Sequence, residues 1–157
     1  PAHWPPEAGF WLSRTYPYVP TGTVHVAIVD PGVGTEREIL VATKDGHVFM
    51  APDNGLLAPV LEDADRVCKL SSGALEALGI DAPSLTFHGR DIFAPLAAEL
   101  AAGRMTIDDI GEDTDDWAPG WLDVPEVTSD RISGIVVTVD TFGNLISHVD
   151  AVLISDL

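Results

Sequence analysis

Hydrophobic and polar residues follow one another along the chain in a pattern that predicts strands separated by helices. Short apolar runs rich in β-branched residues are typical of buried strands. Such runs cover residues 23–29, 38–43, 47–50, 66–70, 135–140 and 145–149. The second and third runs flank Lys44-Asp45-Gly46, and an Asp-Gly pair between two strands favours a tight hairpin turn.

Helices are predicted for three other segments, residues 8–14, about 54–61 and 92–102. The first follows Pro5-Pro6-Glu7, where proline fits the first turn and an acidic side chain stabilises the positive end of the helix dipole. Asn54 is expected to cap the second helix. The third is rich in alanine and leucine and ends at Gly103, and Pro95 fits it only within the first turn.

This succession of elements is typical of an α/β fold with a central sheet flanked by helices. A stretch rich in tryptophan, proline and glycine, residues 117–125, interrupts the pattern. We therefore expect an α/β domain over residues 1–125, a boundary near 125–132, and a second domain that begins with the strands of residues 132–157.

The chain is strongly acidic, with 25 Asp and Glu against 8 Lys and Arg and a formal net charge of −17. Nucleic-acid binders need clustered Lys and Arg to neutralise phosphates, so the composition argues against that class. Acidic residues are densest over residues 108–116. This segment lacks the spaced glycine and terminal glutamate of a calcium loop, and a solvated loop is the favoured interpretation over a metal site.

Cysteine content and hydropathy bear on where the protein works. Cys68 is the single cysteine, so no internal disulfide can form, and a reducing compartment suits it. The longest apolar runs are far shorter than the roughly 20 residues of a membrane helix, and no leader pattern opens the sequence. We expect a cytoplasmic protein without a membrane partner.

Three loops combine glycine with charged residues at the ends of predicted elements: residues 30–37, 86–91 and 140–144, with residues 51–55 as a fourth. Ligands commonly bind at the carboxyl ends of strands in α/β sheets, and glycine lets the backbone approach them closely. The first loop lacks the glycine spacing and the Lys-Ser/Thr pair of a phosphate loop. Each loop taken alone favours a structural turn over a site, but their joint occurrence indicates a binding site.

The same loops carry a resemblance to a known family. The motifs are IVDPGVGTER at 28–37, APDNGLL at 51–57, TFHGRDIFAP at 86–95 and DTFGNLI at 140–146, with TYPYVPTGTVHVAIVDPGVG at 15–34. In order and spacing they resemble the S-adenosyl-L-methionine hydrolases (hydroxide adenosyltransferases), to which the fluorinating and chlorinating enzymes are related. The resemblance implies hydrolysis of S-adenosylmethionine to adenosine and methionine, a small C-terminal β-barrel begun by residues 132–157, and a homotrimer with active sites between subunits.

The resemblance also implies a set of residues that positions and activates water, namely Asp30, Arg37 and His88. The halogenating members look different at the Asp30 and His88 positions, so a halide nucleophile is not expected, whereas Gly89 discriminates less. Without the resemblance, His88 reads as a capping or core histidine, and Asp30 with Arg37 reads as a structural ion pair in a turn.

Four further residues resemble positions that contact the substrate. Asp140 corresponds to a carboxylate that meets the amino group, Phe142 and Asn144 to residues that pack on and hydrogen-bond the adenine, and Trp4 to a position near the nucleoside.

The implied chemistry suits these residue types. The sulfonium departs as a neutral thioether, so the reaction needs a positioned water rather than a general acid, and no metal or other cofactor is expected. A neighbouring arginine favours the hydroxide form of that water, and Asp30 and His88 can accept or relay the proton.

Two departures and two alternatives accompany this interpretation. Residues 1–7 do not supply the opening strand and Asp-Phe-Gly loop of the family, and the sequence stops shortly after the Asn144 strand, where family members continue into a complete small β-barrel. We therefore expect an internal fragment of a longer protein. One alternative is a noncatalytic module that binds adenosine or S-adenosylmethionine. The other is a metal hydrolase using His25, Asp30 and His88, which the lack of paired histidines at zinc spacing disfavours.

Overall fold

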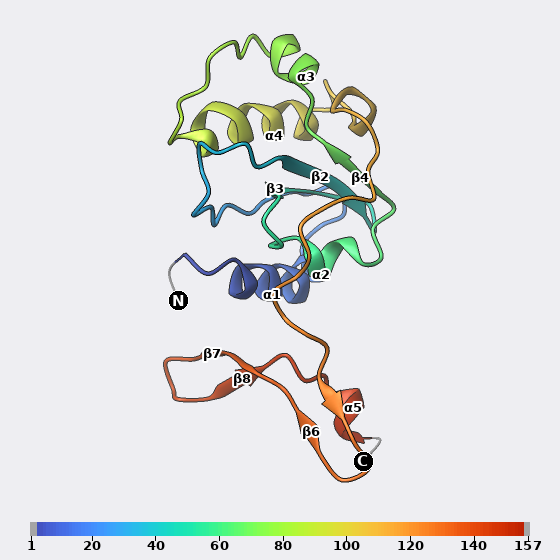
Figure 1. The fold of residues 1–157 in the computed structure, drawn as a ribbon. Helices are drawn as coiled ribbons and strands as arrows, with labels where there is room; N and C mark the ends of the chain where they lie inside the picture. The colour runs from blue at the N-terminus through green and yellow to red at the C-terminus, as the bar shows by residue number, and fades with distance from the viewer. Residues whose placement is uncertain (1–2, 156–157) are drawn as a thin grey trace.

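The computed structural model describes residues 3–155 and has a four-stranded mixed sheet at its centre (Figure 1). The strand order is β1 (Val24–Val26), β3 (His47–Pro52), β2 (Ile39–Lys44) and β4 (Arg66–Lys69). β1 runs parallel to β3, and β2 pairs antiparallel with both β3 and β4. The expected α/β class with a central sheet and flanking helices is confirmed.

The hairpin between β2 and β3 forms where it was predicted. Lys44 pairs with His47, and the two residues between them have positive φ angles, 52° for Asp45 and 74° for Gly46. Positive φ at both central residues defines the turn whose twist matches that of paired strands. Local turn chemistry therefore sets the register of the two central strands.

β1 is shorter than the predicted strand over residues 23–29. The Ala27 N–H still donates to the Met50 carbonyl, but β3 ends at Pro52. Proline has no N–H with which to continue the ladder. The chain therefore leaves the sheet after Ala27 and reaches Asp30 outside it.

Helices cover both faces of the sheet. The first layer consists of α1 (Pro5–Thr15), the 3-10 turn η1 (Tyr16–Tyr18) and α2 (Ala58–Leu61). The second consists of α3 (Ser72–Ala77), the π-helical turn η2 (Gly89–Phe93), α4 (Ala94–Ala101) and the 3-10 turn η3 (Ile107–Asp109). In Figure 1, α3 and α4 lie on one side of the sheet, and α1 and α2 lie on the other.

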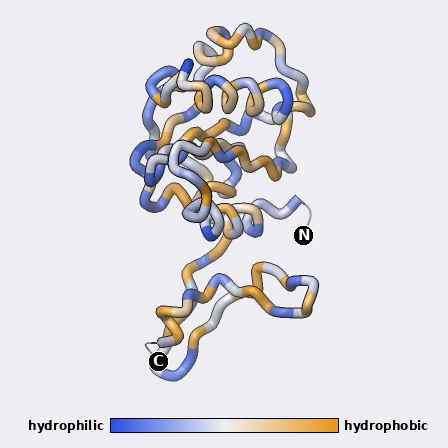
Figure 2. The backbone as a smooth tube through the Cα atoms, turned by 180° about the vertical axis from the view of Figure 1, so that it is seen from behind, coloured by the Kyte–Doolittle hydropathy of each residue, from blue (hydrophilic) through white to orange (hydrophobic). Residues whose placement is uncertain are grey.

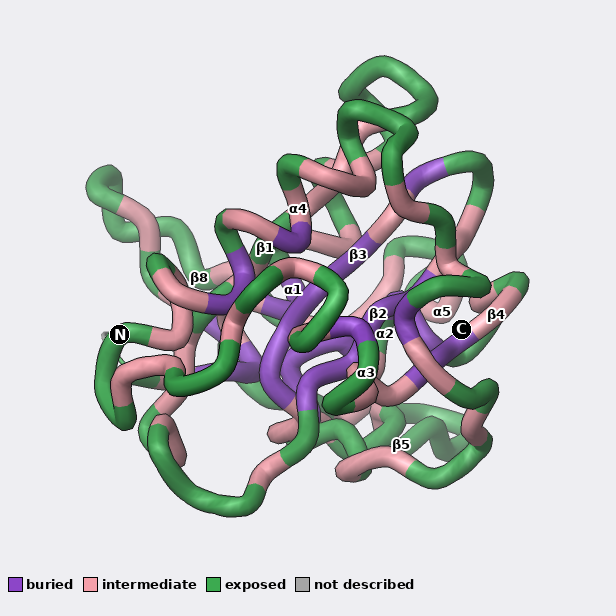
Figure 3. The backbone as a smooth tube through the Cα atoms, turned by 90° about the horizontal axis from the view of Figure 1, so that it is seen from above, coloured by how far each residue is buried: buried purple, intermediate pink, exposed green. Residues whose placement is uncertain are grey.

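Alternate residues of β2 divide the core into two parts. Leu40 and Ala42 pack with residues of α2, whereas Val41 packs with Phe93 and Leu96 of the η2–α4 segment. This is the period-two pattern of a strand buried on both faces. Figure 3 shows the buried segments gathered in these central strands.

Two predictions about the helices are corrected and one is confirmed. Asn54 does not cap α2: the cap position is Leu57, and the Asn54 side chain bonds to Val29 and Leu56 instead. The third helix begins earlier than predicted, as a π-helical turn at Gly89. Pro95 lies in the first turn of α4, as the sequence required.

The acidic stretch covers the outer edge of β4. The Thr114 N–H donates to the Val67 carbonyl, and the Lys69 N–H donates to the Glu112 carbonyl. Arg66 forms ion pairs with Asp108 at 2.6 Å and with Asp113 at 2.8 Å. Within residues 3–155, no group of three or more His, Cys, Asp or Glu side chains is arranged to hold a metal ion.

The last part of the chain forms two small hairpins and a short helix. These are β5 (Glu126–Val127) with β6 (Ile132–Ser133), β7 (Val136–Val139) with β8 (Leu145–Ser147), and α5 (Ala151–Ser155). The predicted strands at 135–140 and 145–149 correspond to β7 and β8, while β5, β6 and α5 were not predicted. The expected β-barrel stays a prediction.

The β7–β8 hairpin lies beside α1, and both hairpins remain largely exposed (Figure 1). Val137 is buried, and Arg14 of α1 forms an ion pair with Asp150 at 3.3 Å. Hydrophobic stretches occur along the β7–β8 hairpin as well as in the central sheet (Figure 2). No helix in the described part of the chain is long and apolar enough to cross a membrane.

Candidate active site

The loop from Asp30 to Arg37 crosses from β1 to β2, over the end of β3. Within it, the Val33 N–H donates to the Asp30 carbonyl and the Thr35 N–H donates to the Gly32 carbonyl. Gly34 has a φ of 80°, and a Cβ there would lie 2.4 Å from the Leu85 carbonyl oxygen. Only glycine fits this position, and the close approach holds the loop against the segment that leads to His88.

Asp30 and Arg37 form a buried ion pair across the two ends of this loop. Arg37 Nε donates to Asp30 Oδ2 at 2.9 Å, and Nη2 donates to the same oxygen. The side chains are only 4% exposed for Asp30 and 11% for Arg37. Asp30 Oδ1 is buried and has no hydrogen-bond partner among residues 3–155. A buried carboxylate oxygen without a partner is energetically costly, so this atom is the unsatisfied hydrogen-bond acceptor of the site.

His88 completes the cluster from the start of η2. Its Nδ1 lies 2.8 Å from Arg37 Nη2. A guanidinium only donates, so Nδ1 must be the acceptor and the ring proton of the neutral imidazole sits on Nε2. Burial lowers the pKa of His88, and the positive charge of Arg37 lowers it further, against a smaller opposing effect of Asp30.

The position of the His88 side chain favours a role in the cluster over a role as a helix cap. The His88 side chain makes no capping bond to the helix it precedes and faces Arg37 instead. Its Nδ1 lone pair is already engaged, so His88 can offer a donor at Nε2 but no free acceptor. Asp30 Oδ1 is the remaining base of the three.

Asp140, Phe142 and Asn144 form a self-contained turn between β7 and β8. Asp140 Oδ1 accepts the N–H groups of Phe142 and Asn144, both at 2.8 Å, and Oδ2 accepts from Asn144 Nδ2 at 2.7 Å. These hydrogen bonds lower the pKa of Asp140. The Phe142 side chain is 89% exposed.

The turn is not hydrogen-bonded to the Asp30 cluster within this chain. Trp4 occupies the cap position of α1 and makes no capping side-chain bond. The structure therefore brings together Asp30, Arg37 and His88, and leaves the four substrate-contact candidates apart from them.

His25 belongs to a different cluster. Its ring stacks on Phe49, with centroids 4.8 Å apart, and its Nε2 lies 3.2 Å from Nδ1 of the buried His47. Tyr16 packs edge-on against all three rings. His25 is thus a core histidine, and it does not join Asp30 and His88 in a metal site.

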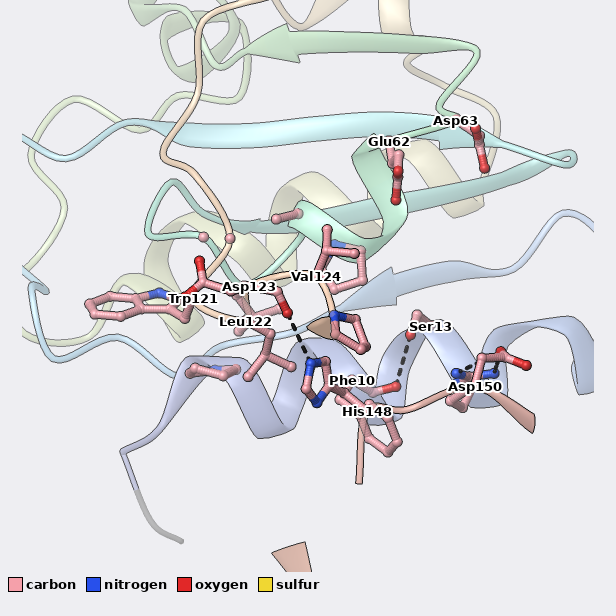
Figure 4. Close-up of a pocket in the computed structure, with 18 residues that line it drawn as sticks. Phe10, Ser13, Glu62, Asp63, Trp121, Leu122, Asp123, Val124, His148 and Asp150 are labelled. Atoms are coloured by element: carbon pink, nitrogen blue, oxygen red, sulfur yellow. Dashed lines mark hydrogen bonds and ion pairs between the residues drawn. The ribbon is translucent and has the colours of Figure 1, made fainter. Parts of the chain in front are cut away.

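A pocket of about 690 Å³ lies elsewhere, between α1, α2 and residues 120–125 (Figure 4). Figure 4 shows Glu62 and Asp63 at one end, Trp121 at the other, and His148 bonded to the Asp123 carbonyl. None of Asp30, Arg37 and His88 lines it. This pocket is therefore separate from the cluster of Asp30, Arg37 and His88.

Comparison with known proteins agrees with the motifs. Residues 1–111 match the family model of the SAM hydroxide adenosyltransferase N-terminal domain. An (R)-S-adenosyl-L-methionine hydrolase of Salinispora arenicola is 42% identical over 139 residues, which cover 85% of this chain and 51% of that protein. A fluorinase of Actinopolyspora mzabensis is 29% identical over 155 residues, covering 89% of this chain and 50% of that protein.

The fold matches a solved structure as well. The crystal structure of an uncharacterized conserved protein from Thermotoga maritima superimposes with a TM-score of 0.87 at 33% identity, over 99% of this chain and 59% of that one. The chain thus spans about half the length of the curated relatives it matches.

Proposed function

Because the chain belongs to the SAM hydroxide adenosyltransferase family, we propose that the whole protein hydrolyses S-adenosyl-L-methionine to adenosine and L-methionine. The observation that carries the proposal is the buried Asp30–Arg37–His88 cluster with one unpartnered carboxylate oxygen, Asp30 Oδ1.

Asp30 Oδ1 is the group that receives the proton in this mechanism. Water attacks the 5′ carbon, the carbon–sulfur bond breaks, and the electron pair leaves with sulfur as the neutral thioether of methionine. The proton lost by water passes to Asp30 Oδ1 and then to solvent. No general acid is needed, because the leaving group carries no negative charge.

Arg37 and His88 prepare the same water without exchanging protons. The positive charge of Arg37 stabilises hydroxide character in a nearby water. His88 can donate its Nε2–H to the oxygen of this water and so orient its lone pair. Neither role requires a metal or an organic cofactor, and we propose that the enzyme uses none.

The substrate-binding side of the site comes from a second subunit in this proposal. Asp140 and Asn144 would meet the amino group and the adenine, Phe142 would pack on the adenine, and Trp4 would lie near the nucleoside. The support is that Phe142 is 89% exposed, and that Leu85 and Phe87, which precede His88, are also exposed, at 73% and 58%. Exposed apolar groups next to a catalytic cluster are typical of surfaces that become buried on assembly. A homotrimer, which the family resemblance implies, would place them together.

We assign the reaction to the cytoplasm. The support is Cys68, which is buried and hydrogen-bonded to Asp113. Burial, with that carboxylate, raises the pKa of its thiol to about 11, so it stays an unreactive thiol.

The test is turnover of S-adenosylmethionine by the whole protein in water labelled with oxygen-18. The expected result is one labelled oxygen on the 5′ carbon of adenosine, equal rates with and without a chelator, and no dependence on added halide. The Asp30→Asn variant serves as the control, since its amide cannot take the proton. Intact substrate after long incubation would favour the noncatalytic binding module, and products that appear only with halide would contradict hydrolysis.

A further inference from the structure

The turn after β3, residues 53–54, contacts both ends of the loop from Asp30 to Arg37, which we call the catalytic loop. Asn54 Nδ2 donates to the Val29 carbonyl at 2.8 Å, and Val29 directly precedes Asp30. The Asp53 N–H donates to the Glu38 carbonyl at 2.9 Å, and Glu38 directly follows Arg37. Asp53 and Asn54 therefore bond to the residues that flank the two ends of the loop carrying the ion pair.

Sheet topology explains why this turn occupies that place. β3 lies between β1 and β2, so the loop that connects β1 to β2 must pass over the end of β3. The residues that leave β3 there lie beneath both ends of the loop. A side chain at this point can fix the spacing of Asp30 and Arg37, which are seven residues apart.

The Asn54 side chain is itself fixed. Its Oδ1 accepts the Leu56 N–H at 3.2 Å, which forms a turn that asparagine favours. Its backbone carbonyl accepts from Trp121 Nε1 at 2.6 Å. On the far side, Asp53 Oδ1 accepts the Ala118 N–H at 2.7 Å. The turn is thus anchored to residues 118–121, and Asn54 Nδ2 is the side-chain donor that it presents to the loop from Asp30 to Arg37.

We propose that Asn54 is a positioning residue, which sets the Asp30 carboxylate against Arg37 through the Val29 carbonyl. This inference rests on the proposed function and adds a residue that touches neither water nor substrate. Because the Val29–Asp30 peptide is one plane, a rotation at the Val29 carbonyl tilts the Asp30 backbone with it. A shift of the carboxylate of about 1 Å can cost on the order of a hundredfold in rate.

The experiment compares variants of the whole protein. Asn54→Asp keeps the Oδ1 acceptor for Leu56 but replaces the donor with an oxygen facing the Val29 carbonyl. Asn54→Ser is a neutral second variant, which keeps the local turn and is too short to bond to Val29, should the charged one fail to fold. Trp121→Phe is the matched control, because it removes the other side-chain bond to Asn54 and leaves the bond to Val29.

Both Asn54 variants are expected to lower kcat by roughly ten- to a hundredfold while KM stays within about twofold. The nuclear magnetic resonance signal of the Arg37 Nε–H, which bonds to Asp30, is expected to shift in both. Trp121→Phe should keep the wild-type kcat and the wild-type signal.

Three results overturn the proposal: wild-type kcat in a folded Asn54 variant, an unchanged Arg37 signal, or an equal fall in kcat in Trp121→Phe. If the wild-type protein does not turn over S-adenosylmethionine, the proposed function is what fails. The Arg37 signal then decides by itself whether Asn54 positions the ion pair.

Discussion

At the level of single residues, His88 is held in one protonation state by its bond to Arg37. Protonation at Nδ1 would turn the acceptor into a donor facing a guanidinium, which breaks the contact. The pKa of His88 is lowered in the folded protein by burial and by Arg37. A histidine with a lowered folded pKa adds stability above its unfolded pKa, and this contribution is lost as the pH falls through the folded value.

We therefore expect kcat to be flat near neutral pH and to fall on the acid side, with an apparent pKa below the ordinary value of 6.5 for histidine. The measurement is a pH–rate profile from pH 8 down to about pH 4.5, a window that spans the ordinary titration of histidine. His88→Asn has an amide oxygen that can accept from Arg37 without titrating. This variant should have a lower overall rate and should lack the acid limb of the profile, the fall in kcat at low pH. His25→Phe should retain it, although the pKa of His25 is also lowered. A limb that survives in His88→Asn would assign the titration to another group.

In the proposed mechanism Asp30 and His88 act on one water, so their effects should not add. Asp30→Asn keeps an oxygen for Arg37 but cannot accept the proton, and His88→Ala removes the Nε2–H donor. Each is expected to lower kcat by at least about a hundredfold, and the double variant should cost little more than the worse single one. Steady-state kinetics on the three proteins measures this, with circular dichroism as the check on folding. Losses that multiply in the double variant would mean that the two residues act on separate steps.

Arg37 differs from the other two because removing it affects the fold. Arg37→Ala would leave Asp30 buried without its partner, and breaking a buried pair in this way costs about 3–5 kcal/mol. Chemical denaturation should detect that loss. The activity of this variant therefore cannot be assigned to chemistry alone.

At the level of elements, the catalytic loop depends on a glycine that packs against a neighbouring segment. Gly34→Ala would place a Cβ 2.4 Å from the Leu85 carbonyl oxygen at a φ of 80°. Gly22→Ala is the matched control, because Gly22 has a similar φ of 88° and no atom within 4 Å of the added Cβ.

Backbone strain alone costs about 1–2 kcal/mol, and this is the whole expected effect of Gly22→Ala. Gly34→Ala should be less stable than Gly22→Ala. It should also lose about tenfold or more in kcat, because the loop carrying Asp30 must move. Thermal unfolding and steady-state kinetics on both variants test the difference. Equal activity in the two would show that the contact with Leu85 does not position the loop.

The sequence predicted elements well where their cause is local. The β2–β3 hairpin follows from Asp45-Gly46, and the start of α1 follows from Pro5-Pro6. It failed where the cause lies far away in the chain. β1 ends early because of Pro52 on another strand, and the partner of Asn54 is Val29, 25 residues earlier. α3 has only six residues, of which one, Ala74, is buried, so its periodic signal was too weak to predict a helix.

The same distinction applies to the site. The motifs singled out Asp30, Arg37 and His88, and the fold brings all three into contact. The motif at 51–57 was recognised, but its Asn54 was assigned a capping role. The bonds that Asp53 and Asn54 make to either end of the catalytic loop depend on strand order. Strand order cannot be read from local spacing.

At the level of the whole molecule, the proposed function divides the site into two parts, and no hydrogen bond joins them within the described chain. Asp30, Arg37 and His88 form one half, and the turn from Asp140 to Asn144 forms the other. If neighbouring subunits complete each site, a subunit damaged in one half can still supply the other half. Mixed oligomers of two inactive proteins should then regain activity.

The pair of variants for this test is Asp30→Asn and Asp140→Ala in the whole protein. Each alone should be nearly inactive, the first in proton transfer and the second in substrate binding. After dissociation and reassembly in equal amounts, each interface pairs two subunits at random. A native site forms when the subunit supplying Asp30 carries only the Asp140 change and its neighbour carries only the Asp30 change. The mixture should therefore recover about a quarter of the wild-type activity in a closed head-to-tail ring. Sedimentation should show three subunits before and after mixing. Reassembled mixtures that stay inactive would place both halves of the site within one subunit, and the β7–β8 turn would then have to reach the Asp30 cluster of its own chain.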